Sequence, residues 1–364
     1  MSWFLAFAGF AVLVILHELG HFTAAKAVGM RVEKFSLFFP PTLLSKKVGE
    51  TEYAVGSIPL GGYVKISGMN PSEDLPEEVR DRAYHAQPVW KRIVVIAAGP
   101  AVNLVLAFVL FWIFFVAIGP QETTTRVATV EKKMPAAGAI QPGDKLVAVD
   151  GVRGDPARLS KQIQKHKCAG TPTDRCKATT PAILLVNRDG DLIRLRLTPI
   201  YDANPGQGVD PRTRLGFGFA SDGPHVTYPP GEALDIAADN FWLITKETVK
   251  LPLRLINPEQ RKEISGVVGS YEATRQTILN DVADAVGILA IISLSLAIVN
   301  LFPFLPLDGG HIFWAIVEKV RGKPVPMRIM ERSGVIGFAL VLILFFIGLQ
   351  NDIGRLTGEG FNVR

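Results

Sequence analysis

The sequence predicts an α-helical polytopic membrane protein with four transmembrane helices and an inserted extracytoplasmic domain of mixed α/β structure. The mean hydropathy of the 364 residues is +0.25, and the apolar residues gather in four runs. Between the second and third runs lies a long segment of mixed polarity, which is typical of a folded, water-exposed domain. With two Cys and 20% charged residues, the chain has the composition of neither a disulfide scaffold nor a disordered protein.

The four apolar runs are long enough to form membrane helices. A bilayer core takes about 20 apolar residues as helix, and the second and third runs carry no charge. The first run has the length of a signal peptide, but no basic segment precedes it and no small-residue cleavage site ends it. We therefore expect four spans, at residues 2–25, 93–119, 286–305 and 333–349.

The distribution of basic residues predicts the orientation of these helices. Ten Lys and Arg lie in the 26–93 loop and five lie in the loop before the fourth run, whereas the termini hold few. Because short loops rich in Lys and Arg stay in the cytoplasm, both termini and the 120–284 segment are expected outside. The net charge of +5 is too small to indicate nucleic-acid binding, and no nucleic-acid partner is expected.

The external segment contains signals of a folded domain. Pro-Gly and Asp-Gly turns separate strand-like runs, residues 183–200 predict a β-hairpin, and residues 232–255 predict a helix. Cys168 and Cys176 form a disulfide in an oxidising compartment, or else stay as two unpaired thiols. The chain is thus expected to have four parts: a first membrane half (1–119), the mixed α/β domain (120–225), a helical linker (226–284) and a second membrane half (285–364).

The first apolar run ends in an H-E-x-x-H motif made by His17, Glu18 and His21. On a helix, residues i and i+4 share a face, so both imidazoles can bind one Zn²⁺ while Glu18 acts as a general base on water. Ionisable residues inside an apolar helix are costly and mark a functional site. The alternative is an interfacial helix end whose side chains are solvated.

A catalytic zinc usually takes three protein ligands, and Asp308 is the candidate for the third. This residue follows the third apolar run, at the same predicted depth in the membrane as His17 and His21. Two prolines precede it and two glycines follow it, so the backbone there departs from regular helix. The alternatives are that Asp308 is a helix-capping or loop carboxylate, or that His311 is the ligand.

Three motifs together resemble the site-2 proteases, peptidase family M50, and most closely the bacterial regulator-of-sigma-E protease type. They are the motif at 17–21, the run from Asn300 to Gly309, and Ala98-Gly99-Pro100-Ala101-Val102-Asn103. The resemblance covers nearly the whole chain. It implies a PDZ domain between the second and third spans, and the single pattern at residues 136–151 is similar to a PDZ core, as in members with one such domain.

The resemblance also implies which residues form the site. Its zinc ligands fall on His17, His21 and Asp308, and its general base falls on Glu18. Asn300 matches a residue that contacts the substrate in that family.

A Gly-rich segment of the cytoplasmic loop resembles the family's membrane-associated β-hairpin, which contacts the substrate strand. The residues implied for this contact are Gly61, Gly62 and Tyr63. From the residues alone, an ordinary amphipathic hairpin is the alternative.

The implied function is that of an intramembrane zinc metalloprotease in the bacterial inner membrane, with both termini and the PDZ-like domain outside. Its expected partners are the lipid bilayer and single-span membrane proteins, such as an anti-sigma factor or a signal-peptide remnant, cut within their transmembrane segments. Two other classes are a catalytically inactive PDZ scaffold and a membrane transporter with a metal site. The intact Glu18 argues against the first, and the lack of paired broken spans argues against the second.

Overall fold

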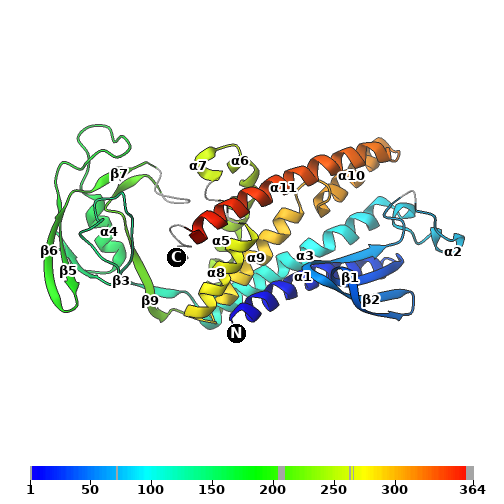
Figure 1. Ribbon diagram of the computed structural model, residues 1–364, viewed down its shortest axis with the longest axis horizontal. Coiled ribbons are helices and arrows are strands. Elements are labelled where there is room, and N and C mark those ends of the chain that lie inside the picture. The colour runs from blue at the N-terminus through cyan, green and yellow to red at the C-terminus, as the bar shows by residue number, and fades with distance from the viewer. Residues whose placement is uncertain (1, 71–72, 204–209, 262–263, 265, 358–364) are drawn as a thin grey trace. The chain divides into compact units, whose positions relative to one another are not determined.

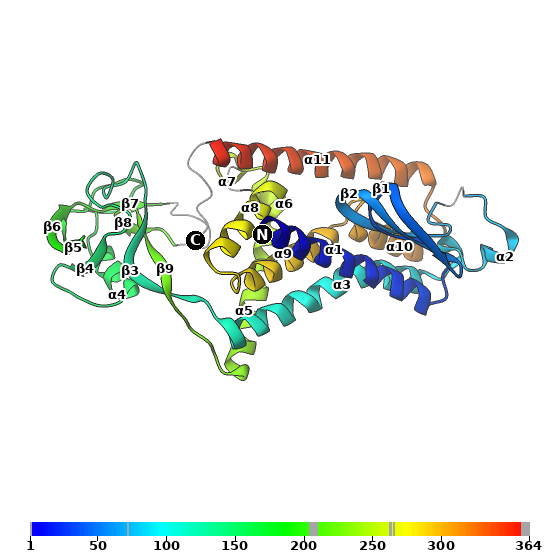
Figure 2. The ribbon, with the colours of Figure 1, turned by 60° about the horizontal axis from the view of Figure 1, so that its bottom comes forward.

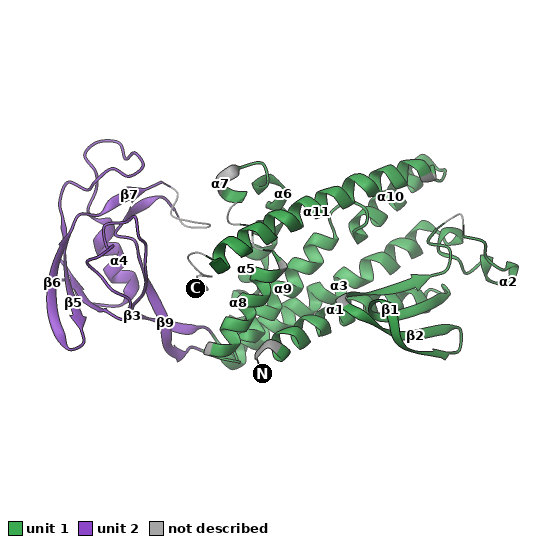
Figure 3. Ribbon diagram, in the orientation of Figure 1, with its two compact units in different colours: residues 1–119, 227–363 green, residues 120–226, 364 purple. Residues whose placement is uncertain are grey.

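The structure, a computed structural model, describes residues 2–70, 73–203, 210–261, 264 and 266–357 (Figure 1). It divides into two compact units, which Figure 3 shows in different colours. Residues 120–226 form one unit, and the segments before and after them form the other. The smaller unit is therefore an insertion in the chain of the larger, helical unit.

Three helices of the helical unit are long and apolar enough to cross a membrane. They coincide with three of the four predicted spans, the first, second and fourth. The third predicted span forms a shorter apolar helix of 16 residues, α9 (Ala285–Asn300), because the prolines at 303 and 306 prevent the helix from continuing. The long helices are α1 (Ser2–Ala27), α3 (Val89–Ile113) with a π-helical turn (Phe114–Ile118), and α11 (Met327–Thr357).

Shorter helices complete this unit. The predicted helix at 232–255 is α5 (Pro230–Val249), which ends early because Pro252 has no N–H to donate. The other α-helices are α2 (Glu77–Arg80), α6 (Leu251–Arg254), α7 (Pro258–Arg261), α8 (Val267–Asn280) and α10 (Asp308–Arg321), and a 3₁₀ turn, η1, spans Tyr84–Ala86.

The helix α3 is the central element of the helical unit, since it packs against α1, α5, α9 and α10. Both ribbon views show α1 and α9 lying along it (Figures 1 and 2). One buried cluster joins α3, α5 and α9, and four of its seven members are alanines. Small side chains let helices approach closely, which favours packing between helices in an apolar surrounding. The cluster consists of Ala107, Phe111, Phe115, Ala233, Ala237, Ala290 and Leu294.

The loop between α1 and α3 carries a small sheet of two long, bent strands, β1 (Val32–Val48) and β2 (Thr51–Ile66). The first arm of β1 lies between the two arms of β2, because Phe35 pairs with both Tyr53 and Val64. The last arm of β2, residues 62–66, therefore has a strand neighbour on one side only within the described chain. An edge strand of this kind keeps one row of backbone N–H and C=O groups free.

The inserted unit is a five-stranded antiparallel sheet with one helix. The strand order is β6-β5-β4-β3-β9, and the predicted hairpin at 183–200 is confirmed as β5 and β6. Its buried core joins the sheet to α4 (Pro156–Gln164) through Leu159 and Ile163. The strands are β3 (Gln121–Val130), β4 (Lys145–Val149), β5 (Ala182–Arg188), β6 (Asp191–Leu197) and β9 (Phe217–His225), with a separate pair β7 (Ile200–Asp202) and β8 (Arg212–Arg214).

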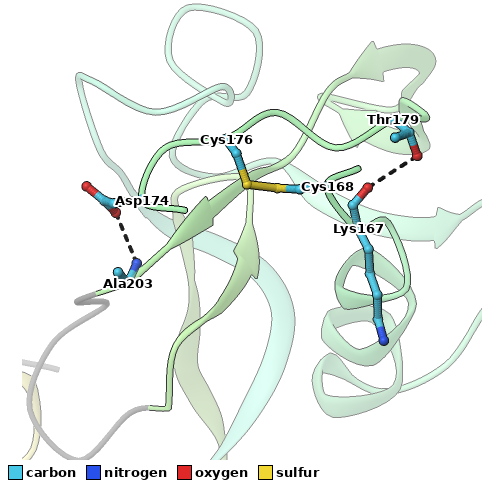
Figure 4. The surroundings of a disulfide bond; sticks show 6 residues. All are labelled: Lys167, Cys168, Asp174, Cys176, Thr179 and Ala203. Carbon is cyan, nitrogen blue, oxygen red and sulfur yellow. Dashed lines mark hydrogen bonds between the residues drawn. A yellow bond between two sulfur atoms is a disulfide. The ribbon is translucent and has the colours of Figure 1, made fainter. Parts of the chain in front are cut away.

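Cys168 and Cys176 form a disulfide in the inserted unit (Figure 4). Hydrogen bonds secure both sides of the loop that it closes. The Thr179 hydroxyl donates to the Lys167 carbonyl at 3.2 Å, and the Ala203 N–H donates to the Asp174 carboxylate at 3.0 Å. Of the two possibilities that the sequence left open for these cysteines, the structure has the disulfide.

A buried ion pair ties the turn before β4 to the end of β5. Asp144 is 2% exposed, and both of its oxygens accept from Arg188 at 2.7 Å. These hydrogen bonds from Arg188, together with the N–H of Gln141, lower the pKa of the Asp144 carboxyl below its ordinary value of 3.8. The carboxylate is thus ionised throughout the neutral range and holds the turn in place.

Replacing Asp144 with Asn should lower the free energy of unfolding of the inserted unit by about 1.5–3 kcal/mol, the usual value of hydrogen bonds to a charged group. Because the folded pKa is lowered, this stabilisation is present above the unfolded pKa of about 3.9 and is lost as the pH falls through the folded pKa. Hydrogen exchange of β4 and β5 in the full-length, detergent-solubilised protein at neutral pH measures the effect of the substitution.

The matched control is Asp189→Asn, at the turn of the same hairpin. Asp189 is exposed and has a positive φ of 53°, a conformation that Asn adopts readily. This control should change the stability by less than about 0.5 kcal/mol. Equal effects of the two substitutions would show that the buried ion pair is not what stabilises the unit.

Candidate metal centre

The helices α1 and α3 cross at two glycines, and this crossing sets the distance across the candidate site. A Cβ atom on Gly20 would lie 2.6 Å from the main-chain oxygen of Ala98, and one on Gly99 would overlap the imidazole of His21. Real side chains do not approach so closely, so only glycine fits at both positions. The backbone of α3 therefore lies directly against the ring of His21.

Three of the predicted site residues converge at this crossing. His17 and His21 are buried on one face of α1, and Asp308 is the first residue of α10. The two Nε2 atoms are 3.2 Å apart, and Asp308 Oδ2 lies 3.2 Å from His17 Nε2 and 3.4 Å from His21 Nε2. In the described part of the chain, these three residues are the one group of His, Cys, Asp and Glu whose ligand atoms are close enough to hold a metal ion.

The spacing of these atoms fits a zinc ion. Ligands at the corners of a tetrahedron, each about 2.0–2.1 Å from zinc, lie about 3.3–3.4 Å from one another. The three measured separations, 3.2, 3.2 and 3.4 Å, agree with this value. Asp308 Oδ2 is also buried and faces the same point as the two Nε2 atoms, which suits an oxygen that binds a cation together with them.

Asp308 is held in place by the backbone around it. The two glycines that follow it pack against the main chain of the 301–305 turn, where a Cβ on either would overlap a backbone atom. Farther along α10, Glu318 accepts two hydrogen bonds from Arg92 of α3, at 2.6 and 3.0 Å. Because Arg92 is 8% exposed, this bidentate pair is a firm link between the helix that carries Asp308 and α3.

Glu18 is close to the residues predicted to contact the substrate. It lines a small pocket together with Gly61 and Gly62, and the rest of the lining is apolar. Tyr63 lies next to them on the same edge strand, and its ring stacks on Phe39 with 6.1 Å between the ring centroids. Apart from Glu18, Gly61 and Gly62, the pocket is lined by Phe10, Ala11, Val14, Ile15, Leu37 and Phe38.

Asn300 is the last residue of α9 and is separated from Asp308 by the turn at 301–307. Its contact with a substrate stays a prediction, as does the substrate contact of the Gly-rich strand. His311 lies one helical turn after Asp308 and is not a member of the metal-holding group. Its role as an alternative ligand therefore has no geometric support.

Two contacts of the histidines were not anticipated from the sequence. The Val95 carbonyl lies 2.9 Å from His21 Nδ1, and the Asn103 amide lies 3.4 Å from His17 Nδ1. Asn103 is fully buried in α3. From the sequence, Asn103 is only the end of the 98–103 motif, and its polarity within an uncharged membrane run is the signal that could have indicated a contact at the site. A backbone carbonyl gives no signal in a sequence.

The family profile of Peptidase family M50 matches residues 5–344 of the chain. The protein belongs to this family, the site-2 protease family, and is a zinc metalloprotease. With three apolar helices of spanning length, it is a membrane protein, and its cofactor is Zn²⁺.

Curated relatives match along almost their whole length. Cj1068 of Campylobacter jejuni, whose name describes a zinc metalloprotease, is 30% identical over 95% of this chain and 92% of its own. The similarly named all3971 of Nostoc sp. is 30% identical over 99% of this chain and 98% of its own. Metalloprotease MmpA of Caulobacter vibrioides is 30% identical over 95% and 93%.

The substitution Gly99→Ala should weaken zinc binding at least about tenfold, because the added methyl group overlaps the His21 ring and displaces its Nε2 atom. Titration of the purified protein with a zinc chelator measures the affinity. The added methyl group leaves the charge of the site unchanged, so any loss reflects the position of the ring.

Gly287→Ala is the matched control, in the neighbouring helix α9. A Cβ there would meet the ring of Phe114 at 3.4 Å, which is ordinary van der Waals contact. This variant should bind zinc like the unaltered protein. If Gly99→Ala also binds zinc normally, the imidazole of His21 is not confined by α3 as the structure indicates.

Proposed function

We propose that the protein is an intramembrane protease, which cuts peptide bonds within the transmembrane segments of single-span membrane proteins. The observation that carries this proposal is the convergence of His17, His21 and Asp308 inside a bundle of apolar helices, with Glu18 on the adjoining pocket. His17 lies roughly 20 Å along α1 from its first residue, a distance that places the site within the thickness of a bilayer.

The proposed roles follow from the chemistry of the side chains. The three convergent residues hold the zinc ion, which when bound acts as a Lewis acid on the scissile carbonyl. Glu18 takes a proton from the attacking water and delivers it to the nitrogen of the leaving group. Apart from Glu18 itself, the lining of the pocket is apolar, which limits the access of bulk water to this carboxylate.

A substrate helix has to unwind before hydrolysis, because its peptide groups are otherwise engaged in helical hydrogen bonds. The edge strand at residues 62–66 offers free backbone groups beside Glu18, since Gly61 and Gly62 line the same pocket. We propose that the unwound segment adds to this edge as a further strand, with Tyr63 beside it. Asn300 would contact the same segment from the end of α9.

The proposed topology has four spans in a bacterial inner membrane, with α9 as the third. At 16 residues, α9 is near the lower limit of about 17, and the apolar turn that follows it adds to the apolar length. The cytoplasmic loop carries the β1–β2 sheet, and both termini lie outside. We further propose that the inserted unit is a PDZ-type domain, which binds part of the substrate or excludes bulky external domains.

Replacing Glu18 with Gln should lower the rate of cleavage by a factor of about 10²–10⁴ and leave zinc binding intact. Gln has nearly the same shape as Glu but cannot accept the proton of the attacking water. The measurement pairs zinc content with cleavage of a tagged single-span protein by the purified enzyme in detergent.

The same experiment separates the other two classes of function. A PDZ scaffold or a metal-site transporter would show no cleavage in the unaltered protein. Cleavage that persists in Glu18→Gln would contradict the proposed role of this carboxylate. If Glu18→Gln loses zinc as well as cleavage, the lost activity is explained by the missing ion, and the role of Glu18 in proton transfer is not supported.

The substitution Gly62→Ala should lower kcat while zinc stays bound. Its methyl group would lie 3.0 Å from Glu18 Cγ and 2.9 Å from the Ser36 carbonyl, so it would push the edge strand away from the catalytic carboxylate. A loss of about tenfold corresponds to 1.4 kcal/mol in the activation free energy. Unchanged kcat, measured on the same tagged substrate, would contradict the proposed contact between this strand and the site.

A further inference from the structure

The two histidines of the metal-holding group differ in what their second ring nitrogen meets. His21 Nδ1 lies 2.9 Å from the carbonyl oxygen of Val95. Because a carbonyl can only accept, Nδ1 carries the proton, and the lone pair of the neutral ring is on Nε2. This is the tautomer that binds zinc through Nε2, the atom that faces the group.

The second ring nitrogen of His17 faces a hydrogen-bond donor instead of an acceptor. Its Nδ1 lies 3.4 Å from Nδ2 of the buried Asn103, and an amide NH₂ group can only donate. In this arrangement Nδ1 accepts, and the proton of the neutral ring is on Nε2. That tautomer cannot bind a metal through Nε2, although His17 Nε2 is only 3.2 Å from Asp308 Oδ2.

A half-turn of the Asn103 amide about its last side-chain bond removes this conflict, because it exchanges Oδ1 and Nδ2. Oδ1 is buried and has no hydrogen-bond partner among the described residues, so the rotation breaks no hydrogen bond to that oxygen. The main chain of Asn103 is held separately, since the Ser293 hydroxyl donates to its carbonyl at 2.9 Å. The amide can therefore turn while α3 and α9 stay packed.

We infer that Asn103 is a positioning residue of the zinc site, whose side-chain oxygen accepts a hydrogen bond from Nδ1–H of His17. This bond fixes the ring in the tautomer that directs the Nε2 lone pair at the ion. The inference rests on the proposed zinc ligands. Asn103 thus does for His17 what the Val95 carbonyl does for His21, and both partners belong to α3.

A pair of substitutions tests the inference through zinc affinity. Asn103→Leu has a similar volume and no hydrogen-bonding group, so zinc binding should weaken about 10–100-fold, as is usual when such a partner is removed. Asn103→Asp keeps an acceptor and has no donor, so it should bind zinc as tightly as the unaltered protein or more tightly. Chelator competition with the full-length protein in detergent measures all three affinities.

Ser293→Ala is the matched control, because it removes the hydrogen bond to the Asn103 main chain and keeps the amide. It should leave zinc affinity unchanged. Normal zinc binding by Asn103→Leu would overturn the inference, and so would a loss in Asn103→Asp as large as that in Asn103→Leu. His17→Ala tests the ligand set itself: if it binds zinc normally, the proposed centre is wrong, whatever the Asn103 variants do.

A spectroscopic measurement needs no variant at position 103 and stays decisive if Asn103→Leu does not fold. In zinc-loaded protein labelled with ¹⁵N-histidine, the ring signals of His17 report which nitrogen binds the ion and which one holds the proton. They are assigned by their loss in His17→Ala. A proton on Nδ1 is expected, and a proton on Nε2 would overturn the inference.

Discussion

The crossing of α1 and α3 is the constraint on which the candidate site depends. Two helices in an apolar surrounding gain little from burying apolar surface, so they associate through close packing and through hydrogen bonds. At Gly20 and Gly99 the packing reaches backbone contact, and the imidazole of His21 fills the space that a side chain at position 99 would take. The close approach therefore holds the two helices together and also sets the geometry of the metal-holding group.

The two units of the protein are stabilised by different means. In the inserted unit, an apolar core lies between a sheet and a helix, and a buried ion pair and a disulfide fix the connecting turns. In the helical unit, alanines and glycines lie where helices meet, and the larger apolar side chains of α11 are largely exposed. This contrast is expected if water surrounds the inserted unit and lipid surrounds the helical unit, because exposed apolar side chains are unfavourable in water but not in lipid.

Local patterns predicted the elements of the fold better than their arrangement. Hydropathy indicated α1, α3 and α11, and the alternation at 183–200 indicated the hairpin, because each of these signals lies within one short stretch. The apolar run at 286–305 did not reveal that helix α9 ends at Asn300, since apolar composition does not distinguish helix from turn. The double pairing of Phe35 also left no trace in the sequence, because it depends on partners that lie 18 and 29 residues away.

The same limit applies to the site. His17, Glu18 and His21 were recognised from their spacing on one helix, and Asp308 was placed beside them through its expected depth and a family resemblance. Asn103 and Val95 were not assigned contacts with the histidines, because these depend on how α3 is rotated against α1. That rotation is set by the glycines at the crossing, and a hydropathy pattern does not encode it.

The residues of the metal-holding group lie far apart along the chain, and this has a consequence for how the enzyme is made. His17 and His21 leave the ribosome early, whereas Asp308 follows almost 300 residues later, after the whole inserted unit. The nascent protein therefore has an incomplete metal centre throughout most of its synthesis and insertion. If these three residues hold the ion, as proposed, its binding by all of them is a late step of assembly, one that joins the beginning and the end of the chain.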